Sequence, residues 1–542
     1  MPEILLIQPP VQDFYLTRKR TIPYGLACLA GSLERAGFSV AIFDALATPK
    51  SKPLPRPDQM AYLEPFYGEQ DVSPFGLFHQ YRHFGYSYQH IERTIRESGA
   101  FLVGISSLFT PYSGAADKVA AIVKAVDPGI TVVMGGHHPT ALPKAAMQSE
   151  SVDYVLRGEA EESLPALAAA IKTGRSPAGI PGIVLRQADG RLQINEPAWL
   201  QNFDEVPFPA AHLIKHRYYQ RGPRGAAVVV ASRGCPLHCS YCAFGADSGY
   251  PYRKRSVDSI IQELDEQVRA HDAGFIDFED ENLSMDRRWF MDLMSAVKHH
   301  FAERLIELRA MNGLYPPALD DAMVQAMGAA GFKTLNLALG ATAADQLKRF
   351  NRKDVRPSFE AALHAAGRHN LTAVGYIIVG APDQSADDSL ADLLYLAGQR
   401  VLAGVSVFYP APGSRDYRRC QQRDILPEHF DLMRATALPL DQKTSRLESV
   451  TLLRLGRILN FMKLLKDQGS SVSPSLMAAS GDIPDTADRT AVGIWLLQDF
   501  FSSGIIKGLT PEGRLHAHKT APELARMFID GIQEMDVKGV SS

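Results

Sequence analysis

Arg233-Gly-Cys-Pro-Leu-His-Cys-Ser-Tyr-Cys242 is the most informative stretch of this 542-residue chain, because it holds three of the five cysteines in the spacing C-x3-C-x2-C. Three thiolates on one short loop can hold three irons of a [4Fe-4S] cluster and leave the fourth iron without a protein ligand. Electron-carrier ferredoxins instead use four cysteines for each cluster. An open iron can bind and reduce a small molecule, so the loop predicts a catalytic cluster held by Cys235, Cys239 and Cys242.

A zinc ion is the alternative interpretation of the same loop, since His238 could join the three cysteines as a fourth ligand. Structural zinc sites are normally closed by four such ligands. The residues on either side of the loop fit a strand that leads into a loop and then a helix, which favours the cluster. Structural free thiols are the third possibility.

Length and composition indicate an ordinary globular protein of two or three domains, with 46% hydrophobic and 22% charged residues. A formal net charge of -3 gives no bulk attraction to nucleic acid. The start, Met-Pro-Glu-Ile-Leu-Leu-Ile, has no basic leader, and no apolar run approaches the roughly 18 residues that span a membrane. We therefore expect a cytoplasmic protein without signal peptide or transmembrane segment. Five cysteines do not make a disulfide framework, which fits a reducing compartment.

Residues 1–200 alternate between strand and helix patterns, which predicts a doubly wound, Rossmann-like domain with a parallel sheet. In such sheets, ligands bind beyond the carboxyl ends of the strands. The loops of interest are therefore Pro9-Pro10, Ser106–Thr110, Gly135–Thr140 and Arg157–Glu161. Strands are expected at Glu3–Gln8, Ser39–Phe43, Phe101–Ser107, Thr131–Met134 and Val152–Leu156, and helices at Gly25–Ala36, Ala116–Val126 and Glu162–Ile171.

Thr48–His90 interrupts this alternation as an insertion of 43 residues with nine aromatics and six prolines. Such a composition is too apolar for a solvated linker. Two interpretations are open. The insertion packs on its own domain through its aromatics, or it forms a wall around a large flat ligand or an apolar substrate.

Six further β/α units follow a Pro-containing linker, Gln201–Pro209, and make a second domain over residues 201–424. Six units are too few for a closed eight-stranded barrel, so a partial (β/α)6 barrel is predicted. The cysteine loop follows its first strand, at the end of a barrel where catalytic loops collect. Strands are expected at Ala227–Val230, Gly274–Phe278, Leu305–Met311, Thr334–Leu339, Ala373–Val379 and Gly404–Tyr409.

Residues 425–542 are expected to form a helical domain, opened by the capping box Ser445-Arg-Leu-Glu448. Further helices are predicted over Ala491–Phe501 and around Leu524–Ile532. This domain either caps the barrel or helps to bind the substrate, and the sequence does not separate the two. Cys420 could donate a hydrogen atom or bind substrate, although a lone cysteine is more often structural. Cys28 lies on an apolar helix face and is expected in the core.

The cysteine loop, with Tyr241 directly before its last cysteine, resembles the signature of the radical S-adenosylmethionine superfamily. The resemblance implies a partial barrel, a [4Fe-4S] cluster and S-adenosylmethionine bound to the open iron and reductively cleaved. Many relatives carry Glu-Ser-Gly where this chain has Leu339-Gly-Ala-Thr342. Because this chain lacks the glutamate, the glutamate's role is not carried over to this position. The contacts that it implies for S-adenosylmethionine are Tyr241, Phe244, Glu279, Asp280, Asn312, Gly340, Gly380 and Pro382.

The N-terminal half resembles the cobalamin-binding domain that precedes many radical S-adenosylmethionine domains. Five segments carry the likeness in order: residues 6–10, 22–26, 103–107, 133–140 and 153–159. The D-x-H-x-x-G motif, whose histidine ligates cobalt from below, is absent, and the resemblance favours cobalt without such a ligand; His137 and His138 are testable alternatives. The implied cobalamin contacts are Pro9, Pro10, Tyr24, Gly25, Ser106, Ser107, Leu108, Phe109, Gly135, Gly136, His137, His138, Gly158 and Glu159.

Together these resemblances, which cover about residues 3–420, imply a cobalamin-dependent enzyme that methylates an unactivated carbon or phosphorus centre. An oxidative cyclase or rearrangement enzyme with the same cofactors and a non-catalytic cobalamin or redox sensor remain alternatives. Cleavage of S-adenosylmethionine calls for a low-potential electron donor such as flavodoxin or ferredoxin. The substrate is a small molecule, a lipid, a tetrapyrrole or a peptide. Arg253-Lys-Arg255 is expected either to anchor carboxylates or a substrate, or to lie in solvent.

Overall fold

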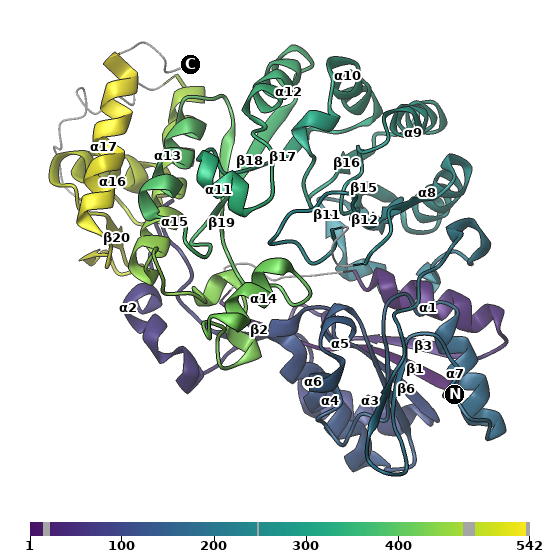
Figure 1. Cartoon of the computed structure of the whole chain (residues 1–542). Coiled ribbons are helices and arrows are strands. Elements are labelled where there is room, and N and C mark those ends of the chain that lie inside the picture. The colour runs from purple at the N-terminus through teal and green to yellow at the C-terminus, as the bar shows by residue number, and fades with distance from the viewer. Residues whose placement is uncertain (15–21, 246–248, 470–482, 538–542) are drawn as a thin grey trace.

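The computed structural model describes residues 1–14, 22–245, 249–469 and 483–537 (Figure 1). The N-terminal domain is built on a seven-stranded sheet in the order β10-β9-β8-β7-β6-β1-β3, in which β8, β7, β6, β1 and β3 are parallel. Its strands are β1 (Ile4–Gln8), β3 (Val40–Asp44), β6 (Leu102–Ser106), β7 (Thr131–Gly135), β8 (Tyr154–Leu156), β9 (Ile183–Arg186) and β10 (Leu192–Ile194).

Helices cover both faces of this sheet, as expected of a doubly wound domain. Leu26 and Leu33 of α1 (Tyr24–Arg35) and Leu167 of α7 (Ser163–Thr173) pack on one face. The other face is covered by α3 (Tyr88–Ser98) and α4 (Ser113–Val126). All five predicted strands are present. The antiparallel hairpin β9–β10 was not predicted, and it extends the sheet beyond β8.

The second domain contains the six predicted parallel strands, in two groups joined by single parallel bridges at Leu308–Phe332 and Leu314–Leu337. The helices lie outside the curved row of strands (Figure 1). The groups are β12 (Arg224–Val229), β15 (Ala273–Phe278) and β16 (Glu307–Arg309), then β17 (Thr334–Gly340), β18 (Thr372–Val379) and β19 (Leu402–Val407). The helices are α8 (Val257–His271), α9 (Arg287–His300), α10 (Asp321–Ala330), α11 (Ala344–Arg349), α12 (Arg356–Arg368) and α13 (Ala386–Ala397).

The two faces of the barrel strands differ in burial. In β18, Ala373, Ile377 and Val379 are buried in the core beneath the helices, whereas Tyr376 and Ile378 on the opposite face are partly exposed. This alternation is what a strand with one covered face shows. The concave face of the row of strands therefore retains side chains that solvent can reach.

The C-terminal region closes the edge of the barrel next to β19. Its longest helix, α15 (Arg446–Asp467), begins with the predicted capping box of Ser445 and Glu448. Gly456 allows close packing on β19, because a Cβ there would lie 2.6 Å from Val405. The region also contains α16 (Arg489–Ser503), β20 (Lys507–Leu509), β21 (Leu515–Ala517) and α17 (Pro522–Val537). Its apolar side chains share one core with the barrel, which is the packing role considered above.

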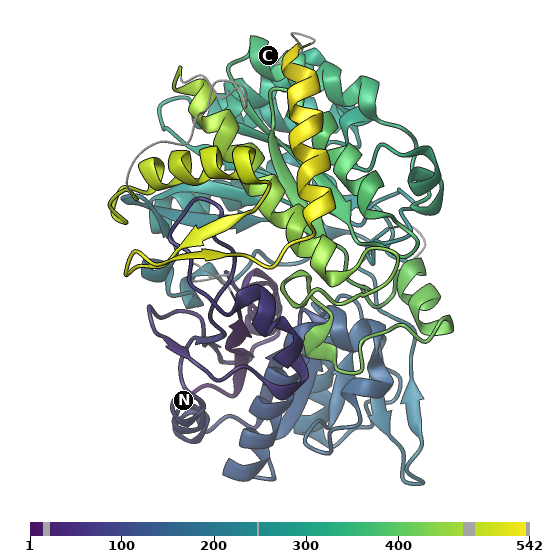
Figure 2. The same cartoon turned by 90° about the vertical axis from the view of Figure 1, so that its left-hand side faces the viewer.

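The aromatic insertion packs mainly on this C-terminal region rather than on its own domain. Phe75 is 1% exposed and meets the ring of Phe461 edge-on at 5.7 Å. The hydroxyl of Tyr62 donates to the carbonyl oxygen of Ala437. We call residues 54–81 the strap; Figure 2 shows its purple ribbon beside the green and yellow C-terminal elements. The strap contains η1 (Asp58–Leu63) and α2 (Glu64–Tyr67). The strands that flank it, β4 (Ser51–Pro53) and β5 (Arg82–Phe84), form a small sheet with β2 (Val11–Asp13) in the order β2-β5-β4.

Within the described part of the chain, no helix combines the length and the apolar character needed to cross a membrane.

Candidate functional site

The cysteine loop begins where β12 ends, and a short ladder closes its base. β13 (Ser232–Arg233) pairs antiparallel with β14 (Arg253–Lys254), and Cys235 bridges Gly245. Gly234 has φ +81°, and a Cβ there would lie 2.4 Å from the carbonyl oxygen of Pro251, so the tight entry to the loop requires glycine. All three cysteines of the loop are free thiols; Cys235 is buried, and the other two are partly exposed.

Three consecutive side chains after β15 clamp this loop. Asp280 accepts hydrogen bonds from the backbone N–H of Ala231 and from the backbone N–H and hydroxyl of Ser232. Glu281 accepts one from the Gly234 N–H at 3.0 Å, and Asn282 donates to the sulfur of Cys235 at 3.9 Å. The predicted acidic segment therefore faces the loop. Asp280 uses both carboxylate oxygens in these hydrogen bonds and so helps to position the loop, and its contact with S-adenosylmethionine stays a prediction.

The chemistry of the donor set fits an iron–sulfur cluster. Burial raises the pKa of the Cys235 thiol, and it raises the pKa of Cys242 to about 11. Iron would replace these protons, since coordination deprotonates a thiol.

Residues that follow β17, the fourth barrel strand, hold the Tyr241 side chain in place. The guanidinium of Arg352 donates to the Tyr241 hydroxyl at 2.7 Å and to the carbonyl oxygen of Ala338 at 2.9 Å. The ring of Phe350 meets that of Tyr241 edge-on at 5.0 Å. Burial raises the pKa of Tyr241 well above its ordinary value, so the phenol stays protonated.

The remaining predicted contacts for S-adenosylmethionine lie at the ends of the other strands. Asn312 follows β16 and donates to the backbone and side chain of Glu279. Gly340 ends β17 with φ +85°, and Gly380 follows β18 with φ +73°. The loop that contains Pro382 is fixed by Gln384, whose side chain accepts from the Ala381 N–H and donates to the Ile378 carbonyl oxygen. The structure thus brings these residues to one end of the barrel, on the same side as the cysteine loop.

The loop after β7 of the N-terminal domain touches the cysteine loop. The ring of His137 lies 4.7 Å from that of Phe244, two residues beyond Cys242. His137 Nε2 lies 3.1 Å from the carbonyl oxygen of Pro412 in the loop after β19. Burial lowers the pKa of His137, so this ring is neutral. A predicted cobalamin contact and a predicted S-adenosylmethionine contact therefore meet directly.

The loops after β6 and β7 have features that fit a cobalamin. Ser107 Oγ and His137 Nδ1 are buried without a hydrogen-bond partner. Leu108 and Phe109 are large apolar side chains, yet each is 44% exposed. Unsatisfied polar atoms next to exposed apolar surface suit a flat ring that carries amide side chains. Pro9, Pro10, Ser106, Gly135 and Gly136 lie at or just beyond the same ends of β1, β6 and β7, and Gly25 is exposed at the start of α1.

Four other predicted cobalamin contacts also contact other parts of the protein. Gly158 packs closely against Ala198, because a Cβ there would lie 2.2 Å from the Ala198 carbonyl oxygen. Glu159 forms ion pairs with Arg253 at 2.8 Å and with Arg233 at 3.3 Å. His138 is buried against Phe430, with Nδ1 3.3 Å from the Thr110 hydroxyl. The hydroxyl of Tyr24 lies 3.5 Å from Glu263 of α8. Glu159 and Tyr24 thereby join the N-terminal domain to the barrel.

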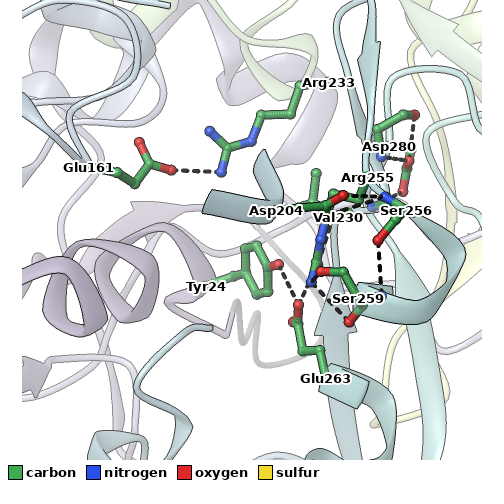
Figure 3. Close-up of polar contacts among 12 residues, drawn as sticks. Tyr24, Glu161, Asp204, Val230, Arg233, Arg255, Ser256, Ser259, Glu263 and Asp280 are labelled. Atoms are coloured by element: carbon green, nitrogen blue, oxygen red, sulfur yellow. Dashed lines mark hydrogen bonds and ion pairs between the residues drawn. The ribbon is translucent and has the colours of Figure 1, made fainter. Parts of the chain in front are cut away.

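An ionic network lies at this interface (Figure 3). The expectation that Arg253-Lys-Arg255 anchors carboxylates is confirmed, whereas the acidic partners were not predicted. Arg233, next to the cysteine loop, pairs with Glu161 of the N-terminal domain at 2.7 Å. Arg255 pairs with Glu263, and both are buried. Side chains from α1, the linker and the barrel line a small cavity beside these pairs, including Tyr24, Cys28 and Phe208. The arginines near the loop were a usable signal, because buried cations need acidic partners.

Family models match both halves of the site. Residues 77–168 match the B12 binding domain, and residues 229–394 match the Radical SAM superfamily. Uncharacterized methyltransferase PH0819 of Pyrococcus horikoshii is 26% identical over 76% of this chain and 82% of that protein. Cytidylyl-2-hydroxyethylphosphonate methyltransferase of Streptomyces wedmorensis is 26% identical over 80% and 84%. Anaerobic magnesium-protoporphyrin IX monomethyl ester cyclase of Rubrivivax gelatinosus is 27% identical over 53% and 52%.

Solved structures share the fold. The cobalamin-dependent S-adenosylmethionine radical enzyme OxsB, with aqua-cobalamin and S-adenosylmethionine bound, matches 99% of this chain and 79% of that chain, with a TM-score of 0.62 and 13% identity. The radical S-adenosylmethionine methyltransferase TsrM of Kitasatospora setae, with tryptophan and an S-adenosylmethionine analog bound, matches 78% and 77%, with a TM-score of 0.59 and 17% identity.

Proposed function

We propose, from the premise that this chain is a radical S-adenosylmethionine enzyme with a B12-binding domain, that it methylates an unactivated carbon or phosphorus centre. The observation that carries the proposal is the contact between the two cofactor regions, where His137 of the B12-binding domain meets Phe244 of the cysteine loop. Relatives named as methyltransferases match most of the chain, which also supports this function.

Three cofactors would supply the chemistry. When bound, the [4Fe-4S] cluster and S-adenosylmethionine supply a 5'-deoxyadenosyl radical for hydrogen abstraction, and cobalamin supplies the methyl group. Cys235, Cys239 and Cys242 would hold the cluster, and the loops after β6 and β7 would hold cobalamin. The hard chemistry belongs to the cofactors, and the protein contributes their positions.

The chain's own residues fix the geometry of this site. Asp280, Glu281 and Asn282 contact Ser232, Gly234 and Cys235 in turn, which fixes the entry to the cysteine loop and the first of its three thiols. Arg352 holds Tyr241 beside the last cysteine. Such support from neighbouring side chains is what keeps metal ligands in position.

The substrate would enter at the concave face of the barrel. On this face Arg309 donates to Asp277, the hydroxyl of Tyr376 donates to Asn336, and Arg309 and Tyr376 remain partly exposed. Met311 and Tyr409, at the ends of β16 and β19, are 48% and 43% exposed. Mixed polar and apolar side chains at one mouth suit a small molecule or a tetrapyrrole. A named relative acts on each kind, a cytidylyl phosphonate and a magnesium-protoporphyrin ester.

Product analysis tests the proposal. The protein is purified without oxygen, reconstituted with iron, sulfide and cobalamin, and incubated with S-adenosylmethionine and a low-potential reductant. We expect both S-adenosylhomocysteine and 5'-deoxyadenosine, because a methyltransferase of this kind consumes S-adenosylmethionine in two ways. Deoxyadenosine alone would instead indicate a cyclase or rearrangement enzyme. A third outcome is that neither product forms although cluster and cobalamin are bound. If the Cys239→Ala variant then still changes its conformation on binding cobalamin as wild type does, the chain is a sensor.

A further inference from the structure

A strongly basic surface borders the exposed side of the cysteine loop. Residues 346–353 contain four Lys or Arg and no Asp or Glu, and residues 413–423 contain four arginines and one aspartate. The whole chain, by contrast, has a net charge of -3. We call the accessible cations the basic rim: Lys348, Arg349, Lys353, Arg415, Arg418, Arg419 and Arg423, of which Arg349 and Arg419 are partly exposed and the others exposed.

Direct contacts connect both basic segments to the loop around Cys239. The Asn351 side chain donates to the carbonyl oxygen of His238 at 2.9 Å. Ser240 Oγ lies 3.0 Å from the carbonyl oxygen of Arg349 and 2.7 Å from the carboxylate of Asp416, the second residue of α14 (Arg415–Gln422). The residues on both sides of Cys239 are therefore held by the backbone that carries the rim.

The loop is also accessible at this place. Pro236 and His238 are exposed, and Cys239 is partly exposed. The acids near the rim offset only part of its charge. Asp416 is 2% exposed and pairs with Arg419, and the partly exposed Asp383 pairs with Arg423. Three further acids, Asp345, Asp354 and Asp424, are exposed at the borders of the two segments, so the seven cations of the rim outnumber these four accessible acids. The accessible surface next to Cys239 is consequently cationic.

We propose that the basic rim is the docking surface for an acidic one-electron donor protein of the flavodoxin type. This inference rests on the proposed function, since a cluster at Cys239 takes up one electron for each S-adenosylmethionine cleaved, and the donor is oxidised by that electron. Opposite charges steer such short-lived encounters and raise their rate. Electron-transfer encounters bury little surface, so a rim of seven cations around one exposed loop is a sufficient area.

A charge-reversal variant tests the proposal. The rim variant is Lys348→Glu/Lys353→Glu. The control is Arg288→Glu/Lys298→Glu on α9, because these two side chains are also exposed and their replacement changes the net charge by the same amount. Binding of an oxidised flavodoxin of net negative charge is followed by calorimetric titration at low and high salt. Reduction of the cluster by the same flavodoxin, previously reduced, is followed by stopped-flow absorbance. Photoreduced deazariboflavin, a small reductant, measures reduction without docking.

We expect the rim variant to weaken flavodoxin binding and lower the bimolecular reduction rate by about tenfold or more at low salt. The difference from wild type should shrink at high salt, because exposed charges are then screened. The α9 variant should behave as wild type, and deazariboflavin should reduce all three proteins equally. Two results would overturn the proposal. One is slower cluster reduction of the rim variant by both flavodoxin and deazariboflavin, and the other is equally weakened flavodoxin binding in the α9 variant.

Two further outcomes are informative. Unchanged flavodoxin binding together with lost retention on heparin would mean that the rim binds a polyanion, and the donor proposal would be wrong. A chain that binds flavodoxin through the rim but holds no cluster reducible by deazariboflavin would retain the docking surface and overturn the proposed function instead. The two proposals therefore fail separately.

Discussion

The imidazole ring of His137 and the phenyl ring of Phe244 lie 4.7 Å apart, at an interplanar angle of 37°. One ring belongs to the B12-binding domain and the other to the cysteine loop, so this contact fixes the distance between the two cofactor regions. A hydrogen bond from the same imidazole to the Pro412 carbonyl oxygen joins a third loop to the contact.

Replacing this imidazole should uncouple the two regions. His137→Ala removes one hydrogen bond and one ring contact, together about 1–2 kcal/mol of interface energy. We expect less bound cobalamin after reconstitution, and less S-adenosylhomocysteine for each 5'-deoxyadenosine formed. Absorbance spectra give the cobalamin content and chromatography gives the product ratio. The exposed His429→Ala is the matched control, and equal values for the two variants would contradict this role of His137.

The ion pair between Arg233 and Glu161 should stabilise the domain interface. Glu161 is 6% exposed and Arg233 is 23% exposed, so removing one partner leaves a poorly solvated charge. We expect Glu161→Gln to cost about 1–3 kcal/mol, with part of the loss offset by the remaining pair with Glu159. A double-mutant cycle with Arg233→Gln, measured by thermal unfolding, gives the coupling energy. A coupling of zero would show that the pair contributes no net stability.

Asp392 should make stability depend on pH. It is fully buried, accepts hydrogen bonds from the Thr342 N–H and hydroxyl, and burial raises its pKa to about 7. A folded-state pKa above the unfolded value of about 3.9 means that the folded chain binds this proton more tightly. The stability that this tighter proton binding adds to the folded state is fully present below about pH 4. It is lost as the pH rises through 7, at a cost on the order of 4 kcal/mol.

The matched variant is Asp392→Asn, which keeps an acceptor for Thr342 and cannot ionise. We expect the melting temperature of the cluster-free protein to fall less between pH 5 and pH 8 in this variant than in wild type, as checked by scanning calorimetry. Parallel pH profiles would show that Asp392 does not titrate in this range.

The strap should be needed for stability rather than for chemistry. Phe75→Ala removes a buried ring from the contact with Phe461, which should cost about 3–5 kcal/mol and lower the melting temperature. Phe75→Leu keeps most of the apolar volume and should cost less. Thermal unfolding of the two variants checks this order. A normal melting temperature with lost turnover in Phe75→Ala would assign the strap to the substrate.

The sequence predicted the two α/β domains because buried parallel strands appear as short apolar runs and amphipathic helices follow between them. The cysteine loop could be located by its spacing alone. The limits of α1 were found within one residue, since Gly37 follows the helix. The hairpin β9–β10 was missed because its strands are only four and three residues long.

Contacts between distant segments could not be predicted from local pattern. Glu159 and Tyr24 lie in segments similar to cobalamin-binding loops, yet their side chains face Arg253 and Glu263 across the domain interface. A charged residue signals that a partner exists but not which one it is. The strap shows the same limit, because its aromatic content predicted burial without identifying the C-terminal region as the surface that buries it.

The strap also sets an order of events for a growing chain. Phe75 and Tyr67 are synthesised several hundred residues before Phe461 and Leu509, which help to complete their core. Domains usually fold one after another during synthesis. Here the N-terminal domain must present an uncovered aromatic segment until α15 and β20 emerge. Expression should therefore respond to chaperone supply, and a fragment that ends before residue 430 should aggregate where the whole chain remains in solution.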